Sequence, residues 1–274
     1  MTTRSPVADH YARSDLVAAI RDGLIRIGKT EDTVTAEDLA PVDEFHIGGR
    51  AATGHLAQQL GLTRNDNILD IGCGLGGPAR QIATHYGCRV TGVDLTRDYI
   101  EAGNVLSGWL QIHDRVLLQE GNALSLPFAN AFFSSAYMLH VGMNIVDKNA
   151  LFAEVARVLR AGARFAIYDV MRTGDGELSY PLPWSSIAAT NAIASPAQYR
   201  DALSAEGFEV VSERDRRDVA LDYFARQKAQ AAAGPAALGV HTLMGARRPE
   251  MVRNMSESIA AGRIAPVEIV ARKL

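Results

Sequence analysis

Residues 67–214 alternate between two patterns of apolar and polar positions. Short apolar runs predict strands, namely Asn67–Ile71, Arg89–Asp94, Val116–Gln119, Phe132–Leu139, Arg164–Asp169 and Glu209–Arg214. Apolar residues at helical spacing predict helices between them, namely Pro78–His85, Arg97–Gly108, Lys148–Leu159 and Pro196–Glu206. The helix over Lys148–Leu159 contains the repeat "LFAEVARVLR", and the "AGA" that follows is expected to end it.

Alternating strands and helices require right-handed crossovers, so the pattern predicts an α/β fold with a doubly wound, mostly parallel sheet. Ligands of such sheets bind at the carboxyl ends of the strands, where the strand order reverses. We therefore expect the binding site at the glycine-rich turn that follows Asn67–Ile71.

Two regions do not follow this alternation. Residues 1–66 predict helices, with a break at Pro41 and a helix opened by two glycines in "GGRAATGHLAQQLG". Residues 218–262 also predict helices, and "RIAPVEIVARK" then predicts a final strand that closes the sheet antiparallel. We expect residues 1–66 to be a segment that covers the ligand site, and residues 67–274 to be the core, with 218–262 as a lid insertion. The alternative is that both helical regions are peripheral additions to the core and do not act as a lid.

Composition narrows the class of protein. The 274 residues are 47% hydrophobic and carry a net charge of −3, with Lys and Arg spread along the chain. Nucleic-acid partners require clustered cations, so none is expected. Cys73 and Cys88 are too few for a disulfide framework or a structural zinc site, and no metal is expected. Without a signal region or an apolar run of spanning length, the default expectation is a cytoplasmic protein that does not insert into membranes.

The stretch "NILDIGCGLGGPARQIA" indicates a nucleotide site. Gly72, Gly74 and Gly77 satisfy the dinucleotide pattern G-x-G-x-x-G, which is weak evidence by itself. Asp70 precedes them, and a carboxylate there would repel a pyrophosphate in a poorly screened cleft. It would favour a ligand with ammonium or sulfonium charge, such as S-adenosylmethionine (SAM), over NAD. The alternative is that Asp70 only caps the following turn.

Two further strand ends support a nucleoside ligand. Asp94, followed by Leu95, ends "RVTGVDLT", where a carboxylate accepts hydrogen bonds from ribose hydroxyls in NAD and SAM sites alike. In "EGNALSLPF", an amide from Asn122 and the backbone N–H of Ala123 are suited to reading an adenine edge. A plain turn is the alternative for that loop.

Four stretches, "ILDIGCGLGGPAR", "VTGVDLT", "EGNALSLPF" and "LFAEVARVLRAGARFAIYDV", together resemble the ordered motifs of class I SAM-dependent methyltransferases. The resemblance covers residues 44–214 and implies a seven-stranded, Rossmann-like sheet. It places Asp70, Gly72 and Gly74 near the methionine part of SAM, which leaves as S-adenosylhomocysteine (SAH). It also places Asp94 at the ribose, Asn122 and Ala123 at the adenine, and Met138 on the methyl side.

Within that class the chain resembles the sarcosine/dimethylglycine and phosphoethanolamine methyltransferases. The similarity lies in "HYARSDLVAAI", "FHIGGRAATGHLAQQLG" and "AYMLHVGMNIVDKNALFAEVARVL". It implies that Tyr11 and His140 meet over the methyl group, with His140 as base or acceptor-orienting group and Tyr11 as latch. The alternatives are a core histidine and a buried aromatic ring. The chain reads "IYDVMR" where the phosphoethanolamine enzymes have a Thr-Asp-Tyr pattern, which argues against a phosphorylated substrate.

Other positions are candidates for the acceptor pocket. His46 and Gly48 open a helix whose N-terminus is suited to the SAM carboxylate, or they serve close packing. Phe45, Tyr168 and Trp184 are expected to line the acceptor pocket, and Arg172 to meet an acceptor carboxylate. N-methylation of a small amine is the leading hypothesis. The alternatives are C- or O-methylation of a hydrophobic ring, such as a quinol or natural product, and a SAM-binding module without catalysis. A homodimer remains open.

Overall fold

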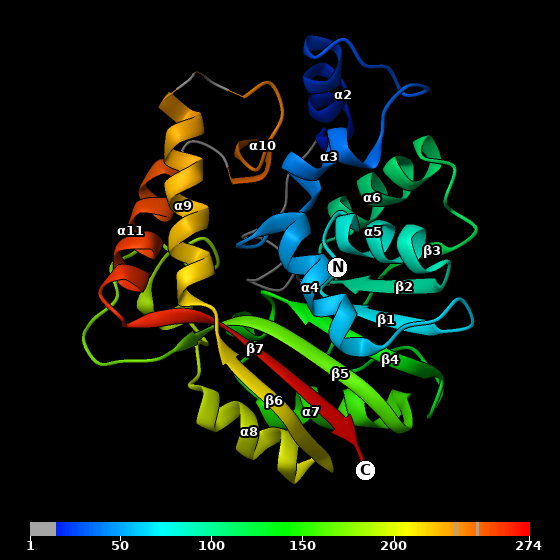
Figure 1. The fold of residues 1–274 in the computed structure, drawn as a ribbon, viewed down its shortest axis with the longest axis vertical. Coiled ribbons are helices and arrows are strands. Elements are labelled where there is room, and N and C mark those ends of the chain that lie inside the picture. Colours follow the sequence, from blue (N-terminus) through cyan, green and yellow to red (C-terminus); the bar gives the residue numbers. More distant parts are fainter. Residues whose placement is uncertain (1–14, 233, 235, 245–246) are drawn as a thin grey trace, which may run out of the picture.

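The computed structural model describes residues 15–232, 234, 236–244 and 247–274, and its centre is a seven-stranded sheet (Figure 1). The strands are β1 (Asn67–Ile71), β2 (Arg89–Asp94), β3 (Val116–Glu120), β4 (Phe133–Leu139), β5 (Leu159–Arg172), β6 (Phe208–Asp215) and β7 (Ile264–Lys273). Their order is β3-β2-β1-β4-β5-β7-β6. Strands β1 to β5 pair in parallel, and β7 lies antiparallel between β5 and β6. The predicted doubly wound sheet with an antiparallel last strand is confirmed.

The start of β5 differs from the expectation. Helix α7 (Lys148–Val158) ends at Val158, and β5 begins at Leu159, so "AGA" lies inside a strand and does not form the helix stop. Leu159 pairs with Phe133 of β4, and both side chains are fully buried. This pairing is a contact between distant segments, which the local helical repeat does not report.

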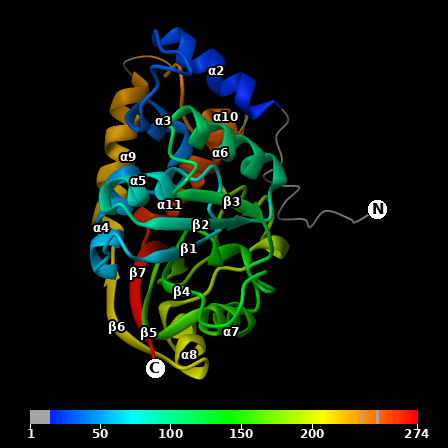
Figure 2. The same ribbon diagram turned by 90° about the vertical axis from the view of Figure 1, so that its right-hand side faces the viewer.

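Helices cover both faces of the sheet (Figures 1 and 2). On one face lie α4 (Gly49–Leu60), α5 (Gly77–Tyr86) and α6 (Arg97–Trp109), whose apolar side chains share a core with β1, β2 and β3. On the other face lie α7 and α8 (Pro196–Ala205), which pack on β4, β5 and β7. The central strands β1, β4, β5 and β7 are therefore covered on both faces, which explains why they are nearly continuous apolar runs, whereas the edge strand β6 is largely exposed.

The remaining helices are α2 (Leu16–Arg26), α3 (Ala36–Asp43), α9 (Arg217–Ala232), α10 (His241–Met244) and α11 (Arg248–Ala260). Figure 1 shows them at the end of the molecule away from α8. Leu238 and Leu243 of the late region share an apolar cluster with Leu24 and Leu39 of the early one. The two helical regions that interrupt the alternation thus pack against each other. None of the described helices has the length and apolar character needed to cross a membrane.

Candidate active site

A cavity of about 540 Å³ lies at the carboxyl ends of β1, β2 and β4. One part of its wall consists of the strand-end residues Asp70, Gly72, Gly74, Asp94, Leu95, Asn122 and Ala123. Another part comes from the segment before α4, and a third from α9, α10 and α11. The size is typical of a small-molecule site. The topology accounts for its place, because the order of the strands reverses between β1 and β4.

Asp70 is the most distinctive polar group at the strand ends. Its side chain is 1% exposed, and among the described residues its Oδ2 atom has no hydrogen-bond partner. Burial, with repulsion from Asp94, raises the pKa of Asp70 to about 7, although the Tyr137 hydroxyl acts to lower it. A buried carboxylate oxygen without a partner is costly unless a cation or donor satisfies it. Asp70 therefore fits the positively charged methionine end of SAM, and a pyrophosphate would worsen the charge.

Asp94 holds the glycine loop in shape. Its Oδ2 accepts a hydrogen bond from the Gly74 N–H at 3.0 Å, and its Oδ1 accepts one from the Thr96 N–H at 2.8 Å. Gly72 has φ +70°, and a Cβ built there would lie 2.2 Å from Cγ2 of Val141. Only glycine allows this turn to approach the segment after β4 so closely. The carboxylate keeps further lone pairs for a ribose.

The loop after β3 has the features of both predicted alternatives, an adenine-binding pair and a plain turn. Asn122 and Ala123 line the cavity, as an adenine-binding pair requires. Asn122 Oδ1 also accepts a hydrogen bond from the Leu124 N–H at 2.9 Å, which is an Asx turn. That turn uses the oxygen of the amide and leaves its NH₂ group for a ligand.

Several predicted site residues do not line the cavity. Met138 is fully buried in the core, and the lining begins one residue later, with Leu139, His140 and Val141. Gly48 is the N-cap of α4, and Arg172 donates a hydrogen bond to the Gly176 carbonyl. Tyr168 also lies outside the lining, and its ring packs against His140 with centroids 5.0 Å apart. The latch predicted at Tyr11 falls outside the described residues.

His140 lines the cavity in a fixed orientation. It has φ +56°, and its Nδ1 lies 3.1 Å from the Tyr168 carbonyl oxygen. Because a carbonyl only accepts, Nδ1 carries the proton, and Nε2 accepts a hydrogen bond from the Ile47 N–H at 3.4 Å. Burial lowers the pKa of His140 to about 4. His140 is therefore neutral near pH 7, and backbone groups contact both ring nitrogens.

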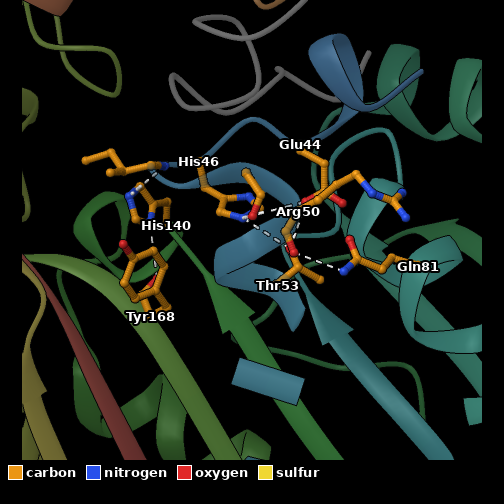
Figure 3. A network of polar contacts seen from close by, with 9 residues as sticks. Glu44, His46, Arg50, Thr53, Gln81, His140 and Tyr168 are labelled. Atoms are coloured by element: carbon orange, nitrogen blue, oxygen red, sulfur yellow. Dashed lines mark hydrogen bonds and ion pairs between the residues drawn. The ribbon is translucent and has the colours of Figure 1, made fainter. Parts of the chain in front are cut away.

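His46 lies beside His140 and has its own network (Figure 3). Its Nε2 lies 3.1 Å from the Gly49 carbonyl and 3.2 Å from the Thr53 hydroxyl. Thr53 in turn donates to Glu44 Oε2 at 2.7 Å, so its hydroxyl oxygen accepts from His46. Nε2 therefore carries the proton, and the lone pair is on Nδ1. Burial, with the nearby His140, lowers the pKa of His46 to about 3.

No sequence pattern indicated the partners of His46. Burial, with the adjacent Asp43, raises the pKa of Glu44 to about 8, and Glu44 Oε1 has no hydrogen-bond partner. Asp43 forms a buried ion pair with Arg80 of α5 at 2.6 Å. This ion pair joins the end of α3, directly before the segment 44–48 that carries His46, to α5, the helix that follows the glycine loop. The two histidines are thus held at a fixed place beside the cofactor end of the cavity.

The far end of the cavity has a different character. Its wall is mostly apolar and aromatic, with Phe45, Ile47, Met143, Trp184, Phe224, Leu243, Val252 and Met255 among the lining residues. Of the candidates for the acceptor pocket, Phe45, His46 and Trp184 lie in this lining. Arg248 lies there too, and no sequence pattern had indicated it.

Comparison with known proteins agrees with this geometry. Residues 69–167 match the family model described as "Methyltransferase domain". The O-methyltransferase resE of Aspergillus sclerotiorum is 30% identical over 225 residues, which cover 80% of this chain and 82% of that protein. The sterol 24-C-methyltransferase of Eremothecium gossypii is 33% identical over 60% of this chain. That match covers 46% of the sterol enzyme, so the chain spans about half of its length.

Solved structures share the fold. The geranyl diphosphate C-methyltransferase of Streptomyces coelicolor A3(2), solved with Mg²⁺, geranyl diphosphate and SAH, superposes with a TM-score of 0.68 at 24% identity. The alignment covers 82% of this chain and 80% of that one. Phosphoethanolamine N-methyltransferase 2 of Haemonchus contortus, solved with SAM, gives a TM-score of 0.70 at 20% identity. It covers 93% of this chain and 60% of that one.

The fold, the strand-end carboxylates and these similarities define the class. The chain belongs to the class I SAM-dependent methyltransferases. It is an enzyme that uses SAM to methylate a small molecule. Its relatives transfer the methyl group to oxygen, carbon or nitrogen, so the family alone does not choose the acceptor atom.

Proposed function

We propose that this enzyme transfers the methyl group of SAM to a hydroxyl oxygen of a largely apolar small molecule. The observation that carries the proposal is the juxtaposition of an apolar acceptor wall with two neutral histidines, His46 and His140. An apolar wall favours a hydrophobic acceptor. A neutral imidazole with a pKa of about 3 is able to accept the hydroxyl proton, because the oxygen becomes strongly acidic as it bonds to the methyl carbon. The similarity to an O-methyltransferase over most of both chains supports the same choice.

The reaction is an in-line displacement. SAM supplies a methyl group on a sulfonium sulfur, and SAM leaves as SAH. A lone pair of the acceptor oxygen forms the new bond to the methyl carbon while the carbon–sulfur bond breaks. The electron pair of the broken bond stays on sulfur. Most of the catalysis is positioning in a pocket from which apolar walls exclude water.

His46 removes the hydroxyl proton in this proposal. Its Nε2–H is held by the Gly49 carbonyl and the Thr53 hydroxyl, so the Nδ1 lone pair is the one that accepts the proton. His140 positions the segment that carries His46, because its Nε2 accepts a hydrogen bond from the Ile47 N–H. Asp70 binds the cationic end of the cofactor, and Asp94 binds the ribose.

The described parts of the two helical regions, within residues 15–66 and 218–262, serve as a lid in this proposal. Val42, Phe45 and Ile47 line the cavity from the first region, and Phe224, Leu243 and Met255 line it from the second. Such a lid excludes water while the methyl group is transferred.

The test is an acceptor panel with methyl-labelled SAM. Matched pairs separate the acceptor atoms: 4-butylphenol against 4-butylaniline, sarcosine as a small polar amine, and an isoprenoid alkene as a carbon acceptor. We expect label in the phenol product. Preferred transfer to sarcosine or to the aniline would establish N-methylation, and transfer to the alkene would establish C-methylation; either result overturns the proposal.

A further inference from the structure

The apolar end of the cavity contains one cationic side chain. Arg248, at the start of α11, is the only lysine or arginine among the described residues of the lining. Around it lie side chains from α9 and α11, including Phe224, Val252 and Met255. A guanidinium is always charged and has five N–H donors, so its placement in an apolar wall requires a partner.

Arg248 is half-buried, and the residues that the structure describes supply no such partner. Its Nε is buried and makes no hydrogen bond, and no carboxylate of the described residues pairs with it. Arg80 differs in having a carboxylate partner: its Nε is also unbonded, but its guanidinium pairs with Asp43 at 2.6 Å. Lys148 donates to the Ala192 carbonyl at 3.0 Å. Among the described lining residues, Arg248 is thus a cation for which no carboxylate of the described residues compensates.

The positive charge of Arg248 acts on two neighbouring groups. Together with Arg226 it acts to lower the pKa of Tyr223 against the larger effect of burial, and together with burial and Arg26 it lowers the pKa of His241. Glu250, in the first turn of the same helix, pairs with Arg247 at 3.1 Å and so does not neutralise Arg248.

We propose that Arg248 is an anion-binding residue that selects acceptors carrying a carboxylate at the end remote from the methylated atom. This inference rests on the proposed function, because it names the class of acceptor: an apolar molecule with a hydroxyl at one end and a carboxylate at the other. The role that the sequence suggested for Arg172 passes to Arg248, since Arg172 lies outside the cavity lining and binds the Gly176 carbonyl. Arginine suits a carboxylate because its fork makes two parallel hydrogen bonds.

The test measures binding and needs no turnover. Calorimetry on the SAH-loaded protein compares 4-phenylbutanoate with 4-phenylbutanamide, which have similar shapes and different charges. We expect the carboxylate to bind at least about tenfold more tightly to the wild type, since charge-assisted bidentate pairs are the strong ones. Arg248→Gln should bring the two affinities close together, and Arg248→Lys should restore part of the preference.

Arg253→Gln is the matched control, because Arg253 is an exposed arginine on the same helix and does not line the cavity. It should leave the preference unchanged. The inference is overturned if the wild type shows no preference for the carboxylate, or if Arg248→Gln and the control Arg253→Gln lose that preference equally. SAH affinity is measured on every variant, so a damaged cofactor site is recognised. A preserved carboxylate preference without transfer to any hydroxyl would refute the proposed function alone.

Discussion

The Ile47 N–H donates a hydrogen bond to Nε2 of His140, 3.4 Å away and 93 residues later in the chain. This contact joins the segment before α4 to the end of β4. His140 is anchored to the sheet, because its backbone N–H and its Nδ1–H both donate to the Tyr168 carbonyl of β5. The position of His46, next to Ile47, therefore depends on an anchor in the sheet.

Replacing His140 tests that anchor. His140→Gly removes the ring and relaxes the φ of +56°, whereas His140→Ala removes the ring and keeps the strain. We expect both to lower kcat by about tenfold or more through lost positioning. SAH affinity should change little in both. The glycine variant should be more stable than the alanine variant by about 1 kcal/mol, as the left-handed penalty predicts. Unchanged kcat in both variants would remove His140 from the mechanism.

Replacing His46 tests the base. His46→Phe keeps an aromatic ring beside His140 and Tyr168 and removes the lone pair. We expect kcat for a phenol of ordinary pKa to fall by about 10²- to 10⁴-fold, the range for general-base catalysis. A phenol acidic enough to be ionised at the assay pH needs no base, so its kcat should fall much less. Equal losses for both phenols would assign His46 a packing role.

Much of the fold followed from local patterns. Strands β1 and β2 have the predicted bounds, because each is a short apolar run between clear turns. The strand-end residues Asp70, Asp94 and Gly72 could be predicted from the sequence for the same reason, because the carboxyl end of a parallel strand follows directly from the bounds of that strand. Glycine spacing and strand order together were enough to predict that part of the cavity.

The acceptor end could not be predicted in this way. Glu44 and Thr53 reach His46 only because the segment before α4 folds back on the first turns of the helix. Arg248 lines the cavity only because α11 packs against the chain near β7 and the loop containing Trp184. These contacts depend on how helices dock, and no sequence spacing encodes that docking.

The glycine loop allows a matched pair of substitutions. An alanine Cβ at Gly72 would lie 2.2 Å from Val141, whereas one at Gly74 would meet no atom within 4 Å. Both positions have positive φ, so both variants incur the left-handed penalty of about 1–2 kcal/mol. Gly72→Ala adds overpacking of about 1–3 kcal/mol. Urea denaturation should therefore show the larger loss for Gly72→Ala, and equal losses would contradict the close approach to Val141.

A buried hydrogen-bonded pair between β5 and α8, Asp169 and Tyr199, predicts a pH-dependent stability effect. Tyr199 donates to Asp169 Oδ2 at 2.6 Å, and burial raises the pKa of Asp169 from 3.8 to about 6. The folded state thus holds this proton more tightly than the unfolded state, and the contribution to stability declines as the pH rises from 3.8 to about 6. The pKa of Asp169 is lowered in part by Lys148 and by the N–H groups of Met143 and Val170, because they favour the carboxylate.

Tyr199→Phe removes a donor to the ionised carboxylate. We expect a loss of about 1–3 kcal/mol at pH 8 and a smaller loss at pH 5, where Asp169 is mostly protonated. Urea denaturation at the two pH values measures the difference. Tyr86→Phe is the control, because Tyr86 is only partly buried and its hydroxyl makes no such bond. A Tyr199→Phe loss that is independent of pH would mean that the hydroxyl does not act through Asp169.

Cofactor binding should depend on pH through Asp70. Its pKa of about 7, raised by burial and by Asp94, lies well above the usual 3.8, so the carboxyl is largely protonated below pH 7. A ligand ammonium favours the carboxylate, and binding must then release the proton. SAH affinity should therefore rise with pH up to about 7. It should fall again at higher pH, once the ligand amino group loses its charge.

Asp70→Asn removes the titrating group and separates this effect from the others. The variant should bind SAH about ten- to hundredfold more weakly, as expected for a lost hydrogen bond to a charged group. It should also show no rise in affinity between about pH 6 and 7, where the wild-type carboxyl, with its pKa of about 7, begins to lose its proton. Calorimetry in two buffers of different ionisation enthalpy counts the protons released at pH 6. If the wild type releases none, or if the Asn variant keeps the same pH slope, another group controls the affinity, and Asp70 does not bind the cationic end of the cofactor.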